Sequence, residues 1–196
     1  MSGGFIALIL FIGVCVLLIT TYNRLVALKN RVANAFAQID VQLKRRHDLI
    51  PNLLEIARKY MNHERETLEA VVAARNQAVG AREAAAKSTG DAEKMSALAA
   101  AEGALGGSLG RLFALSENYP DLKANATMAQ LSEELVSTEN RLSFARQAFN
   151  DAVQQLNTAI ASFPAVLFSA MLGFKPAGML ESIDAPAERA VPVVKF

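Results

Sequence analysis

Two histidines, His47 and His63, are the residues of this sequence with the widest chemical range. An imidazole can bind a metal or transfer a proton, but helical metal sites need a second ligand three or four residues away. Neither histidine stands in a Glu-x-x-His or a His-Glu-x-x-His pattern, so di-iron and zinc-protease sites are not indicated. A turnover that depended on His63 or Glu64 would instead indicate an enzyme of an unrecognised type.

Other sequence patterns of catalysis are missing or lack their structural context. The string Gly106–Gly110 matches Gly-x-Ser-x-Gly but lies within a predicted helix, so it does not indicate a nucleophile elbow. The chain has no phosphate-binding Gly-x-x-x-x-Gly-Lys loop and no Gly-x-Gly-x-x-Gly turn. The strands that position those loops are not predicted either. We therefore expect no catalytic residue, no metal and no cofactor, and we predict that the protein is not an enzyme.

A charged run surrounds the first histidine and consists of Lys44, Arg45, Arg46, His47 and Asp48. Its simplest interpretation is a solvated turn whose cations complement the negative end of a helix dipole. The alternative is a docking point for a partner, because Arg45 and Arg46 can each bind a carboxylate through two hydrogen bonds. On a straight helix the run lies about 36 Å from the membrane, too far for contact with lipid headgroups.

The elements that carry these residues begin with an apolar run from Phe5 to Tyr22. It has no charge and, at about 1.5 Å per residue, just spans a hydrocarbon core of about 30 Å. We interpret residues 5–22 as a transmembrane helix and residues 1–4 as a short N-terminus. A cleaved signal peptide is the alternative, but no basic residue precedes the run and Thr20–Asn23 is no small-x-small cleavage site. Lipid attachment at Cys15 would need a small residue where Val14 stands.

All nearby basic residues follow the apolar run, beginning with Arg24, Lys29 and Arg31. The positive-inside rule therefore places the N-terminus outside and the rest of the chain in the cytoplasm. Acidic and basic residues are nearly balanced, at 19 and 20, so nucleic acid is not an expected partner. The hydrophobic content of 52% owes much to alanine, which favours helix over strand.

We predict a fold of the all-α class, in which the transmembrane helix continues into an antiparallel bundle of about four long helices over residues 23–163. Leu25, Val32 and Ile39 recur every seven residues, so the first helix should run unbroken to about Arg46. Pro51 disfavours helix at the residue before it and predicts a turn between Arg46 and Pro51. A second helix should then end near Lys87, before the turn signal Ser88–Asp91.

The third predicted helix runs from about Ala92 to Asn118 and contains Gly103, Gly106, Gly107 and Gly110. Each glycine costs about 1 kcal/mol relative to alanine in a helix. Their i, i+4 spacing indicates a small-residue face on which another helix packs closely; a backbone surface that faces a ligand is the alternative.

The fourth helix should open at a capping box formed by Thr127 and Gln130 and stop at Pro164. Seven-residue spacing along it predicts coiled-coil-like packing. The positions in this row are Leu135, Leu142, Phe149, Leu156 and Phe163.

An apolar segment and a tail follow over residues 164–196. In an up-down-up-down bundle this segment returns toward the bilayer, where it can cap the bundle or lie in the membrane interface. The candidate interface residues are Val166, Leu167, Phe168, Met171, Leu172 and Phe174.

Several of these segments together resemble the LemA family of bacterial proteins. The similar stretches are residues 22–25, the long run 42–53, His63-Glu64, residues 119–125, residues 138–141 and Phe163-Pro164, and they extend over nearly the whole chain. The sequence departs from the family at Phe149, Leu156 and Met128. The resemblance implies a bacterial inner-membrane protein with one span, no known catalytic residues, and links to membrane organisation, including magnetosome formation, and to membrane proteases.

Two functions follow as hypotheses. The first is a non-enzymatic, membrane-anchored scaffold that forms homo-oligomers in the lipid bilayer through its exposed helical faces. The second is an adaptor that brings substrates to a membrane protease or an envelope-stress system, with Lys44–Asp48 as the docking point.

Overall fold

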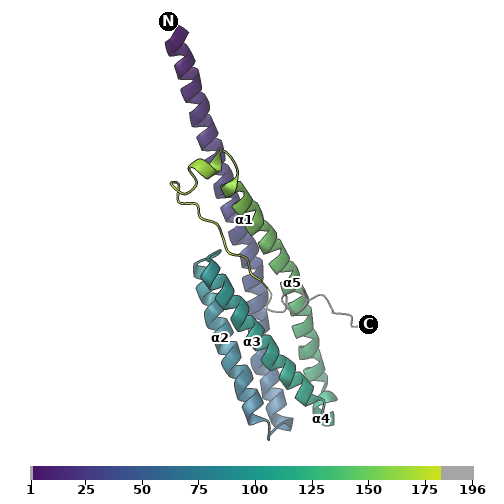
Figure 1. Cartoon of the computed structure of the whole chain (residues 1–196). Helices are drawn as coiled ribbons and strands as arrows, with labels where there is room; N and C mark the ends of the chain where they lie inside the picture. Colours follow the sequence, from purple (N-terminus) through teal and green to yellow (C-terminus); the bar gives the residue numbers. More distant parts are fainter. Residues whose placement is uncertain (1, 182–196) are drawn as a thin grey trace, which may run out of the picture.

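The computed structural model describes residues 2–181 of the chain. Its elements, in chain order, are α1 (Ser2–Tyr60), α2 (Arg65–Lys87), α3 (Ala92–Ser116), α4 (Pro120–Lys123), α5 (Ala126–Ala161) and the 3₁₀ helix η1 (Ala165–Leu167). Residues 2–181 contain no strand, and the long helices run antiparallel beside one another (Figure 1). The predicted all-α class is confirmed.

The N-terminal part of α1 projects beyond all other elements (Figure 1). Its side chains are exposed from Gly3 to Thr20, apart from the half-buried Cys15, and they include large apolar ones such as Phe5 and Phe11. Among residues 2–181, α1 is the one helix long and apolar enough to cross a membrane. Length, composition and exposure therefore support the predicted anchor.

The predicted turn between Arg46 and Pro51 is wrong. Helix α1 continues through Pro51 and ends at Tyr60, and the first turn lies at residues 61–64. Anchor and bundle are thus joined by one helix of 59 residues.

Contacts with α2 explain why Pro51 does not end the helix. A proline leaves the carbonyl four residues earlier without its helical N–H partner, and here that carbonyl belongs to His47. The Nε–H of Arg75 donates to this carbonyl oxygen at 2.9 Å. Leu53 and Ala57, which follow the proline, are fully buried. The arginine and the apolar burial together compensate for the lost backbone bond.

The second turn lies where the sequence predicted it. Gly90 has φ of +85°, a left-handed conformation that suits glycine, and the Asp91 side chain accepts the backbone N–H of Lys94 at 3.0 Å. Helix α3 then runs to Ser116, close to its predicted end.

The start of α5 differs from the prediction. Asn125, rather than Thr127, caps the helix, since its side chain accepts the backbone N–H of Met128 at 3.0 Å. The short helix α4 begins at Pro120, which is favoured at a first helical position, and fills the connection before this cap. At its N-terminal edge the Tyr119 hydroxyl donates to Glu64 Oε1 at 3.3 Å. Desolvation, and then the charge of Glu64, raise the pKa of Tyr119.

The seven-residue row of α5 is buried from Leu135 to Leu156, as predicted, and Phe149 packs edge-on against Phe36 of α1 with ring centroids 5.8 Å apart. The row ends before Phe163, which is 79% exposed because α5 stops at Ala161.

Two apolar clusters fill the bundle. The proximal core, near the anchor, joins Leu25–Leu43 of α1 to Leu142–Ile160 of α5. The distal core joins Ile50–Ala57 of α1, and Met61 just after this helix, to the apolar faces of α2 and α3. Helix α5 packs along α1, α2 packs on α1, and α3 packs on α2. Among the described residues, α3 and α5 are separated by a groove.

Candidate functional site

The predicted docking run is divided by its position on α1. Lys44, Arg45 and Asp48 are exposed, whereas Arg46 and His47 are only 9% and 2% exposed. Since α1 continues past them, the run forms neither a turn nor one continuous surface. The solvated-turn interpretation is wrong, and the docking hypothesis is restricted to the three exposed residues.

Arg46 and His47 belong to a buried polar network that the sequence did not reveal. Nη1 of Arg46 lies 3.2 Å from Glu102 Oε2 and 3.0 Å from Glu139 Oε2. Nε2 of His47 lies 2.8 Å from Glu102 Oε1. Glu102 comes from α3 and Glu139 from α5, so the network joins three helices at the boundary between the two cores.

The geometry of this network suits a structural function, which is to hold α1, α3 and α5 together. Both oxygens of Glu102 are used, and the carboxylate is only 11% exposed. Removal of one partner from such a buried pair leaves a charge without compensation, which costs more than the pair itself contributes. Spacing in the sequence gave no signal for this cluster, because each of its contacts joins residues that are 55 or more positions apart.

Two arginines of α2 secure that helix to α1. Arg75 donates to the His47 carbonyl oxygen. Two helical turns later, Arg82 Nη1 donates to Asp40 Oδ1 at 3.2 Å. The small residues Ala74 and Ala78 on the same stretch of α2 are buried and allow close contact. These bonds fix the α2–α3 hairpin against the middle of α1.

The glycines of α3 line the groove between α3 and α5, whose volume is about 510 Å³. Within the described residues, no atom lies within 4 Å of a Cβ built on Gly107 or Gly110, and only the Arg46 guanidinium approaches Gly106. Among the described residues, the predicted close helix contact is therefore not made at Gly106, Gly107 or Gly110. Apolar side chains of α3 and α5 form the walls, and the Arg46 network lies at the base. The predicted glycine face consists of Gly103, Gly106, Gly107 and Gly110, and all four line the groove.

The apolar segment after α5 has buried residues that cap the bundle and exposed residues that face outward. Ala165, Ser169 and Phe174 are buried, and the Phe174 ring packs edge-on against Tyr22 with centroids 5.7 Å apart. Phe168 is half-buried. These residues cap the bundle, so Phe174 is not the exposed interface residue that we expected.

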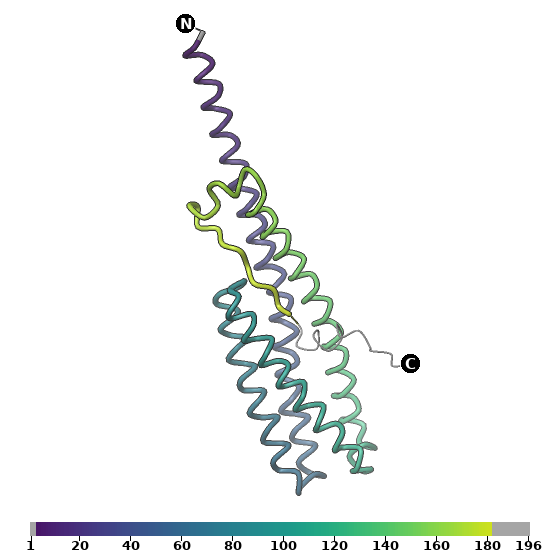
Figure 2. Tube along the Cα trace, viewed as in Figure 1, coloured from purple at the N-terminus to yellow at the C-terminus, as the bar shows by residue number. Residues whose placement is uncertain are grey.

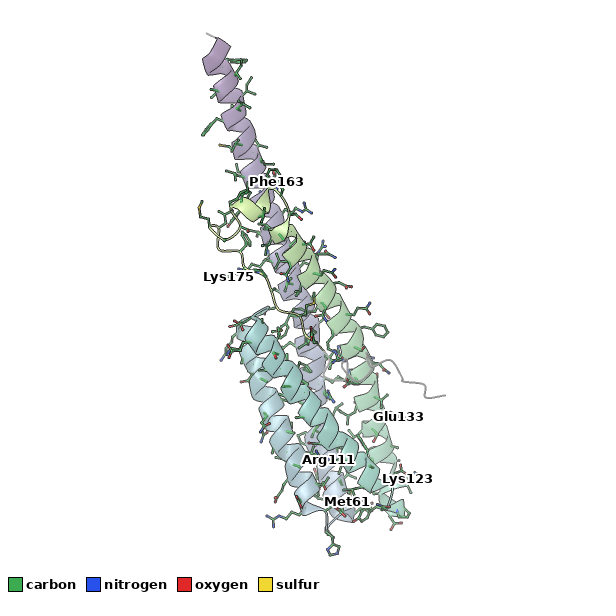
Figure 3. All side chains as sticks on the ribbon, in the orientation of Figure 1. Met61, Arg111, Lys123, Glu133, Phe163 and Lys175 are labelled. Carbon is green, nitrogen blue, oxygen red and sulfur yellow. The ribbon has the colours of Figure 1, made fainter. Side chains whose placement is uncertain are left out.

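The remaining members of the segment face outward and form what we call the apolar collar. Figure 3 shows Phe163 beside α1, at the level where the exposed part of α1 leaves the bundle. The collar consists of Phe163, Val166, Leu167, Met171 and Leu172, with exposed fractions between 40% and 88%.

Residues 174–181 then run back along the bundle as an extended segment (Figure 2). Asn157 donates to the carbonyl of Ala177 at 2.9 Å and accepts its N–H at 2.8 Å. Asn150 does the same for Leu180, at 3.1 and 2.9 Å. The two asparagines lie seven residues apart on α5, beside the buried row. This spacing is the one sequence feature that could have indicated their hydrogen bonds to the extended segment.

Comparison with known proteins identifies the family. A model of the LemA family matches residues 35–196. The chain belongs to the LemA family. Magnetosome protein MamQ of Magnetospirillum gryphiswaldense is 28% identical over 173 residues, covering 81% of this chain and 64% of that protein. The magnetosome proteins MamQ 1 and MamQ 2 of Paramagnetospirillum magneticum are 26% identical over 175 residues, covering 82% of this chain and 64% of each.

This LemA protein thus spans about 64% of the length of these relatives. Neither the family description nor the relatives' names denote an enzymatic activity. Within residues 2–181, no group of three or more His, Cys, Asp or Glu side chains is placed to hold a metal. The features that stand out for function are therefore surfaces: the exposed part of α1, the apolar collar and the groove.

Proposed function

We propose that this LemA protein is a non-enzymatic, membrane-anchored helical scaffold that self-associates in the bacterial inner membrane. The observation that carries the proposal is the exposed apolar part of α1, which is continuous with the bundle. The apolar collar lies beside the exit point of that helix, where it would meet the membrane interface. The names of the MamQ relatives, magnetosome proteins, agree with a role at a membrane compartment.

Self-association is supported by apolar surface that the described residues leave uncovered. Val41 of α1 and Phe144 of α5 are 58% and 74% exposed. Exposed apolar side chains that form a contiguous patch mark surfaces that pack against another protein, and the collar residues Leu167 and Met171 add such surface beside the anchor.

Light scattering coupled to size-exclusion chromatography tests the proposal on the intact chain in detergent, beside a chain that begins at Tyr22. We expect a discrete assembly that becomes smaller without the anchor. A chain that stays monomeric over a concentration series is not a self-associating scaffold.

The orientation is tested separately, with Cys15→Ala as background. We place the N-terminus outside and the bundle in the cytoplasm, because Arg24, Lys29 and Arg31 follow the anchor. A membrane-impermeant thiol reagent on intact cells should label Ser2→Cys and spare Arg58→Cys. The opposite labelling would reverse the topology.

An adaptor for a membrane protease or an envelope-stress system is the second candidate. Its support is the exposure of Lys44, Arg45 and Asp48 in the middle of α1. Arg45 forms only a loose surface pair with Glu134, at 3.7 Å, so its guanidinium is accessible to a partner. Crosslinking in cells that captures a protease, and loses it on Arg45→Glu, would favour the adaptor over the scaffold.

A further inference from the structure

The groove between α3 and α5 continues the path along which the end of the described chain already lies. The extended segment 174–181 descends beside α5, and its last residues, Leu180 and Glu181, themselves line the groove. We propose that residues 182–196 of the same chain occupy this groove and run along α5 toward Leu135.

Asn157 and Asn150 each form a pair of hydrogen bonds with the backbone of the extended segment, and we call these two pairs the asparagine clamps. Their positions define the direction and the repeat of this path. From Asn157 to Asn150 the helix rises about 10.5 Å, at about 1.5 Å per residue. The three steps from Ala177 to Leu180 cover about 10 Å in an extended chain, at about 3.3 Å per residue. Helix and extended segment therefore advance in step and in opposite directions, and the next residues of the chain are delivered into the groove.

The length of the remaining chain is sufficient. From the level of Asn150 to that of Leu135, at the far end of the groove, the helix rises about 22 Å. About seven extended residues reach that far. Residues 182–196 are more than enough.

The groove and the segment match in shape and polarity. Because Gly107 and Gly110 leave open space within the described part, a backbone with small side chains can lie directly on α3. The segment is rich in Ala and Val, and Pro186 and Pro192 favour an extended chain. Both groove and segment carry charges of either sign that can pair: the segment has two acidic and two basic residues, and the charged residues of the groove are Arg46, Arg146, Glu102, Glu139 and Glu181.

Tethering favours this occupant over a second copy or a separate partner. Residue 182 follows directly on Glu181, which is already at the groove, so binding is intramolecular. A short tether gives an effective concentration in the millimolar range and avoids most of the entropy cost of association.

Photocrosslinking on the full-length protein tests the proposal directly. The probe, p-benzoylphenylalanine, replaces Val136, which is 62% exposed and lines the groove; Ala148, exposed elsewhere on α5, is the control position. Mass spectrometry should map the adduct from position 136 to residues 182–196, and position 148 should give no such adduct. Adducts from position 136 that avoid residues 182–196 would overturn the proposal.

A mixture of isotopically labelled and unlabelled chains separates the two possible sources of the segment. Adducts that join only chains of like label place the segment in its own groove. Adducts that mix the labels in statistical proportion assign it to a second copy and refute the intramolecular form.

Filling the groove provides a second, independent measurement. Gly107→Leu places a side chain in the open space, and Gly80→Leu makes the same change at an open position of α2. Both variants gain helix propensity, so both should fold. Gly107→Leu should accelerate amide hydrogen exchange in residues 182–196 by about tenfold, and Gly80→Leu should leave it unchanged. Equal exchange in the two variants would count against occupancy.

Discussion

The proximal and distal cores of the bundle are closed in different ways. In the distal core, helices α2 and α3 cover α1 with apolar side chains such as Leu68 and Leu112. In the proximal core, α1 and α5 form the main pair, and an extended segment ending at Leu180 closes one side. Side-chain amides of α5 satisfy the backbone of that segment, which a helix would satisfy by itself.

This difference teaches that the two halves depend on different kinds of bond. The distal half relies on burial, which is non-directional and tolerates small changes of shape. The proximal half adds a few directional hydrogen bonds whose loss frees a whole segment. The buried network around Glu102 lies between the two and joins α1 to α3 and α5.

The largest expected effect concerns the centre of the proximal core. Phe149→Ala removes a fully buried ring and its edge-on contact with Phe36. We expect a loss of about 3–5 kcal/mol in the free energy of unfolding, measured by denaturant titration of the helical circular dichroism signal in detergent. Phe144→Ala, at an exposed ring of the same helix, is the control and should cost far less.

The boundary network comes next. Glu102→Ala leaves His47 unpaired and Arg46 with Glu139 alone, and should cost about 3 kcal/mol. In hydrogen exchange, both halves should lose protection together if the network couples them; a loss confined to the distal half would show that the cores are independent. Glu134→Ala, which removes the loose surface pair with Arg45, should cost less than about 1 kcal/mol.

The asparagine clamps should have a smaller and more local effect. Asn157→Ala leaves the N–H and carbonyl of Ala177 without their partner and should cost about 1–2 kcal/mol. Proteolysis at Lys175 should accelerate, while the exchange of α2 amides stays unchanged. Asn140→Ala, at an exposed position of α5, is the matched control. Unaltered cleavage at Lys175 would mean that burial of Phe174 alone holds the segment.

The smallest effects distinguish an open glycine from a crowded one. Gly80→Ala has space for its methyl group within the described residues and should stabilise the protein by about 0.5–1 kcal/mol through helix propensity. Gly178→Ala should destabilise it, because the new methyl group meets the backbone of Ala92. Thermal unfolding of the two variants should shift in opposite directions, and shifts of the same sign would contradict this assignment.

Much of the helical architecture could be predicted because local signals and burial agree. The rows at Leu25 and Leu135 have the heptad repeat, and the turn at Gly90 has both a glycine and a capping aspartate. The end of α1 was mispredicted because the deciding bond, from Arg75 to the His47 carbonyl, joins residues 28 positions apart. A local rule for proline cannot include such a partner.

The candidate site was predicted less well for the same reason. The charged run Lys44–Asp48 was found from its composition, but burial divides it, since a helix directs successive side chains to different faces. The glycine face of α3 was predicted from its spacing, but the groove that it lines was not predicted. Asn150 and Asn157 could not be assigned, because their partners are backbone groups of a segment without regular structure.

In the proposed topology, with residues 5–22 in the bilayer, the passage of α1 through Pro51 would make the protein a lever whose short arm lies in the membrane. At about 1.5 Å per residue, Tyr60 lies about 57 Å along the axis from Tyr22. Membrane helices adjust their tilt to the thickness of the bilayer, over a range of about 0–40°. A rigid rod transmits every such adjustment, so a tilt of about 10° would swing its far end sideways by about 10 Å. The bundle therefore converts local membrane thickness into the position of its distal end.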